Sequence, residues 1–138
     1  MIIRSESYVY DRTEERYTFP FCELDTEKRT VTVTDPDSYE RSVTHYHTDF
    51  VKHHLRYVAE HDIGRLKKLV NDGSIIRYLD ELEDKCFELV DSQVEKWKAH
   101  DKEYRVAIMD GDIVKAAGLA NNLVERAKEI ARENIVYR

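Results

Sequence analysis

The sequence has few of the residues that build turns, covalent bridges or stiff linkers. Of its 138 residues, 4 are glycine, 2 are proline and 2 are cysteine. Turns rely on Gly and Pro, so their scarcity beside 41% hydrophobic and 36% charged residues favours a mostly helical globular chain over an all-β or disordered one. Cys22 and Cys86 lie far apart without a CxxC neighbour. This spacing indicates neither a redox pair nor a zinc knuckle and suits a reducing cytosol.

Long apolar segments are also missing. The longest uninterrupted apolar run is Val106 to Met109, and the first ten residues contain no apolar core of the length that a signal peptide needs. We therefore expect a soluble, cytoplasmic protein that does not contact a membrane.

Common catalytic motifs are absent as well, among them GxGxxG, GxxxxGK[ST], HExxH and GxSxG. Asp110-Gly111-Asp112 superficially matches the start of a calcium loop. Val114 and Ala116 follow it, however, at positions where a calcium site needs further oxygen ligands. The tripeptide fits a turn with a helix N-cap better. The sequence therefore predicts no enzyme and no cofactor.

Alternation of apolar and polar residues with a period of two dominates residues 1–46. The alternating stretches are 8–10, 17–21 and 30–34. The polar segment 25–29 suits a hairpin loop, and Asp35-Pro36-Asp37-Ser38 suits a turn, because Pro presets φ while Asp and Ser bond the local backbone. The pattern predicts a three-stranded antiparallel sheet.

After residue 46 the apolar period changes to 3.6. The expected helices run from Thr48 or Asp49 to His61, from an Asp62 cap through Leu66 and Val70 to Asn71-Asp72-Gly73, from a Ser74 cap over roughly 26 residues, and from about Asp112 to Asn134. The longest helix has an apolar seam typical of helix-on-helix packing: Ile75, Leu79, Leu82, Cys86, Leu89, Gln93 and Trp97. Alanines in the last helix allow close approach, so these two helices should form an antiparallel hairpin.

The expected fold is therefore α+β and mainly α. A small N-terminal antiparallel sheet precedes a helical region built on a long antiparallel helical hairpin. We expect one domain over residues 1–138, because this length suits a single core, with a strand-rich subregion at 1–46 and a helical subregion at 47–138.

Histidines are concentrated in one segment, with five of the six between residues 44 and 61. A chelating pair on a helix needs a spacing of three or four, but His47, His54 and His61 recur every seven residues. Only His45 and His47 keep a chelating spacing, provided that a strand continues that far. Two interpretations remain: a metal site at that pair, or polar residues such as His54 and His61 that flank an apolar helix face. The second is simpler, and we expect no metal.

The longest helix also carries a line of acidic residues. Its five carboxylates follow at steps of four, four, three and four residues: Asp80, Asp84, Glu88, Asp91 and Glu95. Like charges at i,i+4 cost a few tenths of a kcal/mol each, and helices normally relieve them with interspersed lysines. This acidic line is either an ordinary solvated face or a docking strip for a basic surface, including the phosphate-binding groove of a nucleic-acid enzyme.

Positive charge is sparse, since the net charge is −6. The compact basic cluster before the C-terminal third is Arg65, Lys67 and Lys68. These residues either contact phosphate or form a solvated helix face. The acidic balance argues against an extended nucleic-acid surface, which requires clustered Lys and Arg.

A further pattern lies in residues 53–91 and 118–138. Its positions are Arg56-Tyr57-Val58-Ala59-Glu60-His61, Leu69 to Gly73, Tyr78-Leu79 with Leu82-Glu83, Asn121-Asn122, Arg126-Ala127, Glu129-Ile130 and Val136-Tyr137. These residues resemble the TnpV family of small transposon-encoded proteins from bacterial mobile elements. The resemblance covers residues 53–138 and does not extend to residues 1–46. It implies an origin in a phage, plasmid or transposon, a bacterial host cell and a non-catalytic, excisionase-like role.

Two functional hypotheses follow from different classes. The first is a non-catalytic accessory protein that binds another protein and inhibits or modulates a nucleic-acid-processing enzyme, with the acidic line and the acidic strand-rich subregion as its candidate surfaces. An anti-CRISPR-like inhibitor of a CRISPR nuclease is one form of it, and a homodimer is compatible with it. The alternative is an excisionase-like DNA-binding factor that uses Arg65, Lys67, Lys68 and the cations of the last helix.

Overall fold

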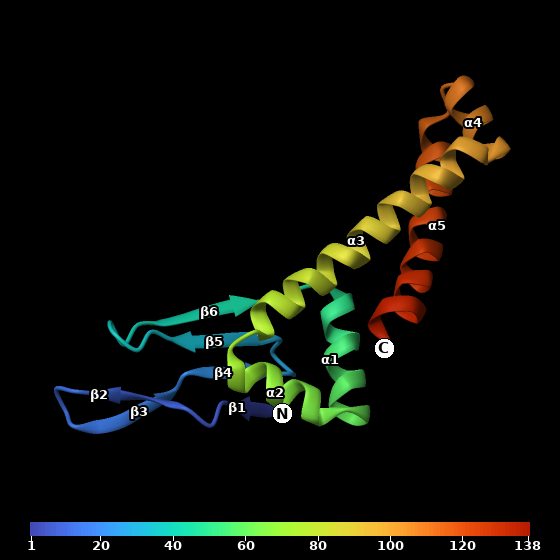
Figure 1. Cartoon of the computed structure of the whole chain (residues 1–138). Coiled ribbons are helices and arrows are strands. Elements are labelled where there is room, and N and C mark those ends of the chain that lie inside the picture. Colours follow the sequence, from blue (N-terminus) through green and yellow to red (C-terminus); the bar gives the residue numbers. More distant parts are fainter.

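Strands occupy the first third of the chain in the computed structural model, which describes residues 1–138 (Figure 1). They are β1 (Ile2–Arg4), β2 (Tyr8–Asp11), β3 (Arg16–Pro20), β4 (Cys22–Asp25), β5 (Thr30–Thr34) and β6 (Arg41–His45). Antiparallel pairing joins them into a four-stranded sheet, ordered β1-β4-β5-β6, and a separate β2-β3 hairpin. Helices follow, so the expected α+β, mainly α class is confirmed.

The strand pairing differs from the expected three-stranded sheet. The stretches at 8–10 and 17–21 pair with each other, whereas 30–34 pairs with β4 and β6. The sequence pattern did not predict β1, β4 and β6. All three are short; β1 and β6 also lack a complete alternation, whereas β4 alternates over only four residues. The expected loop does join β4 to β5. The expected turn joins β5 to β6, where Asp35 Oδ1 accepts from the backbone N–H groups of Asp37 (2.7 Å) and Ser38 (3.0 Å).

The helices are α1 (Asp49–His61), α2 (Ile63–Asp72), α3 (Ile75–His100), α4 (Lys102–Met109) and α5 (Ile113–Ala131), followed by the π-helical turn η1 (Arg132–Val136). Thr48 caps α1 as expected, because its Oγ1 accepts from the Val51 N–H at 3.4 Å. Gly73 ends α2 with φ of 77°, a conformation that glycine adopts without strain. The N-cap positions at Asp62 and Ser74 are correct, but neither side chain makes a capping hydrogen bond.

Two helical segments were not expected. Helix α4 fills the region between the long helices and begins where Asp101 Oδ1 accepts from the Tyr104 N–H at 2.8 Å. The last helix was predicted to reach Asn134, but α5 ends at Ala131 and the chain continues as η1. This wider turn brings the Val136 carbonyl against α1, which matters for the site described below.

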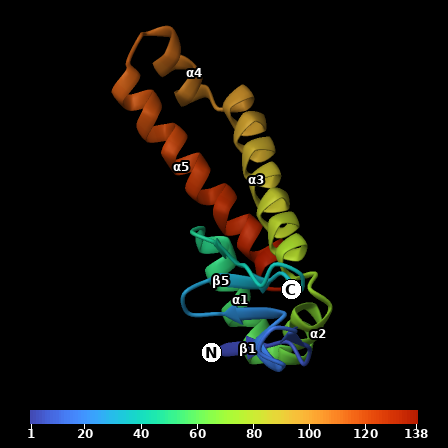
Figure 2. The same cartoon turned by 90° about the vertical axis from the view of Figure 1, so that its left-hand side faces the viewer.

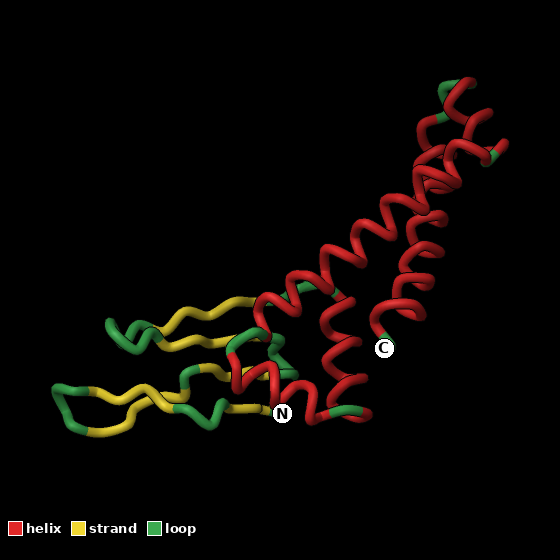
Figure 3. The backbone as a smooth tube through the Cα atoms, viewed as in Figure 1, coloured by secondary structure: helices red, strands yellow, loops and turns green.

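A large apolar core joins the four-stranded sheet to the first three helices. Its buried members are Ile3, Cys22, Leu24, Val31, Tyr46, Val51, Leu55, Val58, Leu66, Val70, Ile75, Leu79 and Leu82. Residues of the strand-rich and helical subregions therefore share one core. The sheet and the helical arm lie at opposite ends of this body, as Figure 3 shows.

A second core holds the antiparallel α3–α5 arm, which extends away from the sheet (Figures 1 and 2). It consists of Phe50, Cys86, Val90, Val94, Ala127, Ala131 and Val136. The expected hairpin is thus confirmed, but its seam is broader than expected after Cys86: Val90 and Val94 are buried, whereas the predicted Leu89 and Trp97 pack against this core half-buried and Gln93 is half-buried. Steps of four replace the alternation of three and four, because α5 crosses α3 at an angle rather than following a coiled-coil path.

Candidate functional site

The acidic line keeps its charge exposed. All five carboxylates lie on the solvent side of α3, and none of them takes part in an ion pair: Asp80, Asp84, Glu88, Asp91 and Glu95. Asp80 alone has an internal partner, since it accepts a hydrogen bond from Tyr46 Oη at 3.0 Å. The other four present uncompensated negative charge along about 17 Å of helix.

An exposed aromatic residue borders the acidic line. The side chain of Phe87 is 45% exposed, although it meets Phe50 edge to face at 5.9 Å. Along α3 it lies between Asp84, Glu88 and Asp91. Sequence reasoning missed this position, although a Phe outside the apolar seam and among carboxylates was a usable signal.

Apolar side chains gather at the tip of the arm, beyond the C-terminal end of α3. The exposed members are Val106, Ile108, Met109, Ile113 and Val114, and Met109 and Val114 are 84% and 85% exposed. Exposed apolar side chains that lie close together commonly mark an interaction site. None of the helices combines the length and the apolar character that a membrane span requires.

The basic cluster is divided by the fold. Lys67 and Lys68 point to solvent, whereas Arg65 bonds Asp62 Oδ2 through Nε at 3.2 Å and Tyr78 Oη through Nη1 at 3.4 Å. Among the cations of α5, the Arg126 guanidinium stacks over Trp97 at 4.8 Å, and Lys128 pairs with Glu125 at 3.3 Å. Arg126 and Lys128 therefore already have partners within the chain, and Arg65 keeps only part of its donors free.

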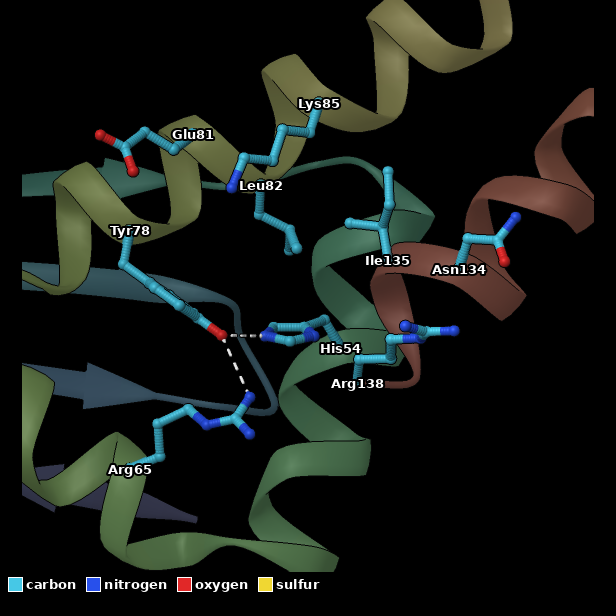
Figure 4. Close-up of a pocket in the computed structure, with 9 residues that line it drawn as sticks. All are labelled: His54, Arg65, Tyr78, Glu81, Leu82, Lys85, Asn134, Ile135 and Arg138. Carbon is cyan, nitrogen blue, oxygen red and sulfur yellow. Dashed lines mark hydrogen bonds between the residues drawn. The ribbon is translucent and has the colours of Figure 1, made fainter. Parts of the chain in front are cut away.

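A polar chain of hydrogen bonds runs through the buried His54, which is 1% exposed (Figure 4). Its Nδ1 lies 2.7 Å from the Val136 carbonyl, and its Nε2 lies 2.6 Å from Tyr78 Oη. A carbonyl can only accept, so Nδ1 carries the proton and Nε2 accepts from the tyrosine O–H. The tyrosine oxygen in turn accepts from Arg65. Helices α1, α2, α3 and the C-terminal turn are thereby joined.

The interpretation of His54 as a residue flanking the apolar helix face is therefore wrong. The His54 ring is inside, because the Val136 carbonyl and Tyr78 satisfy both of its nitrogens. His61 stays exposed beside Tyr57, with ring centroids 4.5 Å apart. Strand β6 ends at His45, whose ring stacks on that of His47 at 6.0 Å. No group of three or more His, Cys, Asp or Glu side chains is placed to hold a metal ion.

The buried histidine should make stability depend on pH. Burial lowers the pKa of His54 from its ordinary value of 6.5; the Val136 hydrogen bond opposes this shift, and the charge of Arg65 adds to it. Between the two pKa values, His54 is protonated in the unfolded chain and neutral in the folded chain. Stability is full above pH 6.5 and is lost as the pH falls from there toward the folded pKa of His54. Urea unfolding at about pH 7.5 and about pH 5.5 should show this loss.

Two single variants separate this effect from general acid sensitivity. His54→Gln should flatten the pH dependence between these two conditions, because it removes the titrating group. His61→Gln removes an exposed histidine and should keep the wild-type dependence. If His54→Gln and the wild type lose stability equally over this range, the assignment of the effect to His54 is wrong.

Comparison with known proteins assigns this chain to no family. No family model, curated protein or solved structure matches the chain.

Proposed function

We propose that this chain is a non-catalytic accessory protein of a bacterial mobile element that binds another protein through the exposed side of α3. The main support for this proposal is that the carboxylates of the acidic line are exposed and form no ion pair within the chain. A row of unpaired charges attracts an oppositely charged surface over long range and fixes its register. The mobile-element origin is supported by the resemblance of residues 53–138 to TnpV proteins.

The surroundings of the acidic line favour a protein partner. Interfaces between proteins combine aromatic or aliphatic anchors with a polar rim. Phe87 supplies an aromatic anchor beside the line, and the apolar tip lies at its end. A row of carboxylates one helical turn apart can take the place of phosphates on a basic groove. The proposed partner is therefore a nucleic-acid enzyme with a basic surface, and inhibition of a CRISPR nuclease is one form of the proposal.

The experiment that tests the proposal is affinity capture from a lysate of a bacterial host, with identification by mass spectrometry. The proposed partner holds this protein in its nucleic-acid groove. Excess duplex DNA should compete for that groove and release the partner from the captured complex. Capture should also weaken as salt rises, because the attraction is between exposed charges.

The alternative, an excisionase-like DNA-binding factor, makes an opposite prediction in a gel-shift titration. At moderate salt we expect no tight binding of duplex DNA, because the net charge is −6 and two cations of the last helix, Arg126 and Lys128, already have partners within the chain. Tight binding that falls steeply with salt, and that is lost on replacing Lys67 and Lys68 with alanine, would instead establish the DNA-binding role.

A further inference from the structure

A recess of about 330 Å³ lies between α2, α3 and the C-terminal end of the chain (Figure 4). Three cationic side chains line it, each from a different segment: Arg65, Lys85 and Arg138. The one carboxylate among the lining residues, Glu81, already accepts from Arg77 Nε at 3.2 Å. The recess is therefore positively charged in a protein whose net charge is −6.

The cations of the recess have free capacity. Lys85 and Arg138 are exposed and take part in no ion pair. Arg65 uses Nε for Asp62 and one N–H of Nη1 for Tyr78, so the remaining donors of its guanidinium are unassigned.

The hydrogen-bond chain through His54 holds Arg65 in place. The only proton of the Tyr78 hydroxyl goes to His54 Nε2, so the tyrosine oxygen faces Arg65 as an acceptor. Asp62 holds Nε and Tyr78 holds Nη1, so the guanidinium is fixed at two points while Nη2 has no hydrogen-bond partner in the chain. A preorganised arginine binds a carboxylate or a phosphate group through two parallel hydrogen bonds.

We propose that this recess binds the phosphate group of a phosphomonoester. Its charge, about −1.5 to −2 near neutral pH, matches three cations better than a singly charged carboxylate does. Leu82 and Ile135 also line the recess and offer apolar contact to whatever carries the phosphate. A small phosphorylated metabolite and the 5′-phosphate end of a nucleic acid share this chemistry. The proposal is independent of the acidic line and stands if partner capture fails.

Titration with inorganic phosphate tests the site on the intact chain, followed by the arginine Nε–Hε signals in NMR spectra. We expect saturable shifts of the Arg65 and Arg138 signals in the wild type. A Lys85→Ala/Arg138→Ala variant should bind phosphate at least about tenfold more weakly and still fold, because both residues are exposed and unpaired. Lys67→Ala/Lys68→Ala removes the same charge from α2 outside the recess and should stay within about twofold of the wild type.

Two further titrations distinguish a small phosphorylated metabolite from a nucleic-acid end. One uses a nucleoside monophosphate, and the other compares an oligonucleotide with and without a 5′-phosphate. Tighter binding of the 5′-phosphorylated strand supports a nucleic-acid end. Binding of the monophosphate without such a difference supports a small metabolite. Absence of saturable binding by any of these phosphates overturns the proposal. Equal weakening in the two double variants also overturns it, since that result means general attraction rather than a site.

Discussion

Reversing Asp84, Glu88 and Asp91 to lysine should abolish capture of the partner protein. The change replaces three unpaired negative charges with three positive ones at the centre of the acidic line. Like charges facing each other across an interface cost several kcal/mol, which corresponds to a loss of more than about a hundredfold in affinity. The measurement is the amount of partner retained by tagged wild-type and variant protein from the same lysate.

A matched variant controls for net charge. Glu40→Lys/Glu60→Lys/Glu129→Lys changes the charge by the same amount at exposed positions outside α3 and should capture the partner normally. Circular dichroism should show unchanged helicity in both variants. In the first variant the i,i+4 pairs 80/84 and 91/95 become oppositely charged, while the pair 84/88 stays like-charged with the opposite sign. Normal capture by the α3 variant, or equal loss in both, would remove the acidic line from the proposed mechanism.

Replacing Leu66 with alanine should have the largest effect on stability. Leu66 is fully buried in the core that joins the sheet to α1, α2 and α3. Truncating such a residue costs about 2–5 kcal/mol, which lowers the melting temperature of a chain of this size by about 7–17 °C. Val114→Ala shortens an aliphatic side chain that is 85% exposed and should leave the melting temperature unchanged.

The same melting experiment tests the prediction of one domain. Trp97 packs against the core of the arm, so its fluorescence reports on α3 and α5, whereas far-ultraviolet circular dichroism reports on the whole chain. We expect both signals to change at one temperature in the wild type and to shift together in Leu66→Ala. A Trp97 transition that stays in place while the other signal shifts would mean that the arm unfolds as a separate unit.

Local signals in the sequence were sufficient for most helices. Thr48, Gly73 and Asp112 act at the ends of helices in the way that their side chains or backbone freedom predict. The length of α3 and its pairing with α5 followed from apolar spacing. Helix α4 was missed because its apolar residues, such as Val106 and Ile108, stay exposed and therefore form no buried stripe.

The candidate sites were less accessible to sequence reasoning. The acidic line was visible because carboxylates at helical spacing necessarily share one face. The recess was not, since Arg65, Lys85 and Arg138 are separated by long stretches of sequence. His54 was misjudged for the same reason: its two partners, Tyr78 and Val136, come from other helices, and one of them depends on an unexpected π turn.

The sequence by itself determined the class of the fold, the helical hairpin and the exposed row of charge, because each can be inferred from the spacing of apolar or charged residues within single segments. Only the tertiary structure decided which strands pair, which histidine is buried and which cations meet in one recess. Those outcomes depend on residues that are distant in sequence, and the choice among them is made by how all the apolar surfaces are buried together.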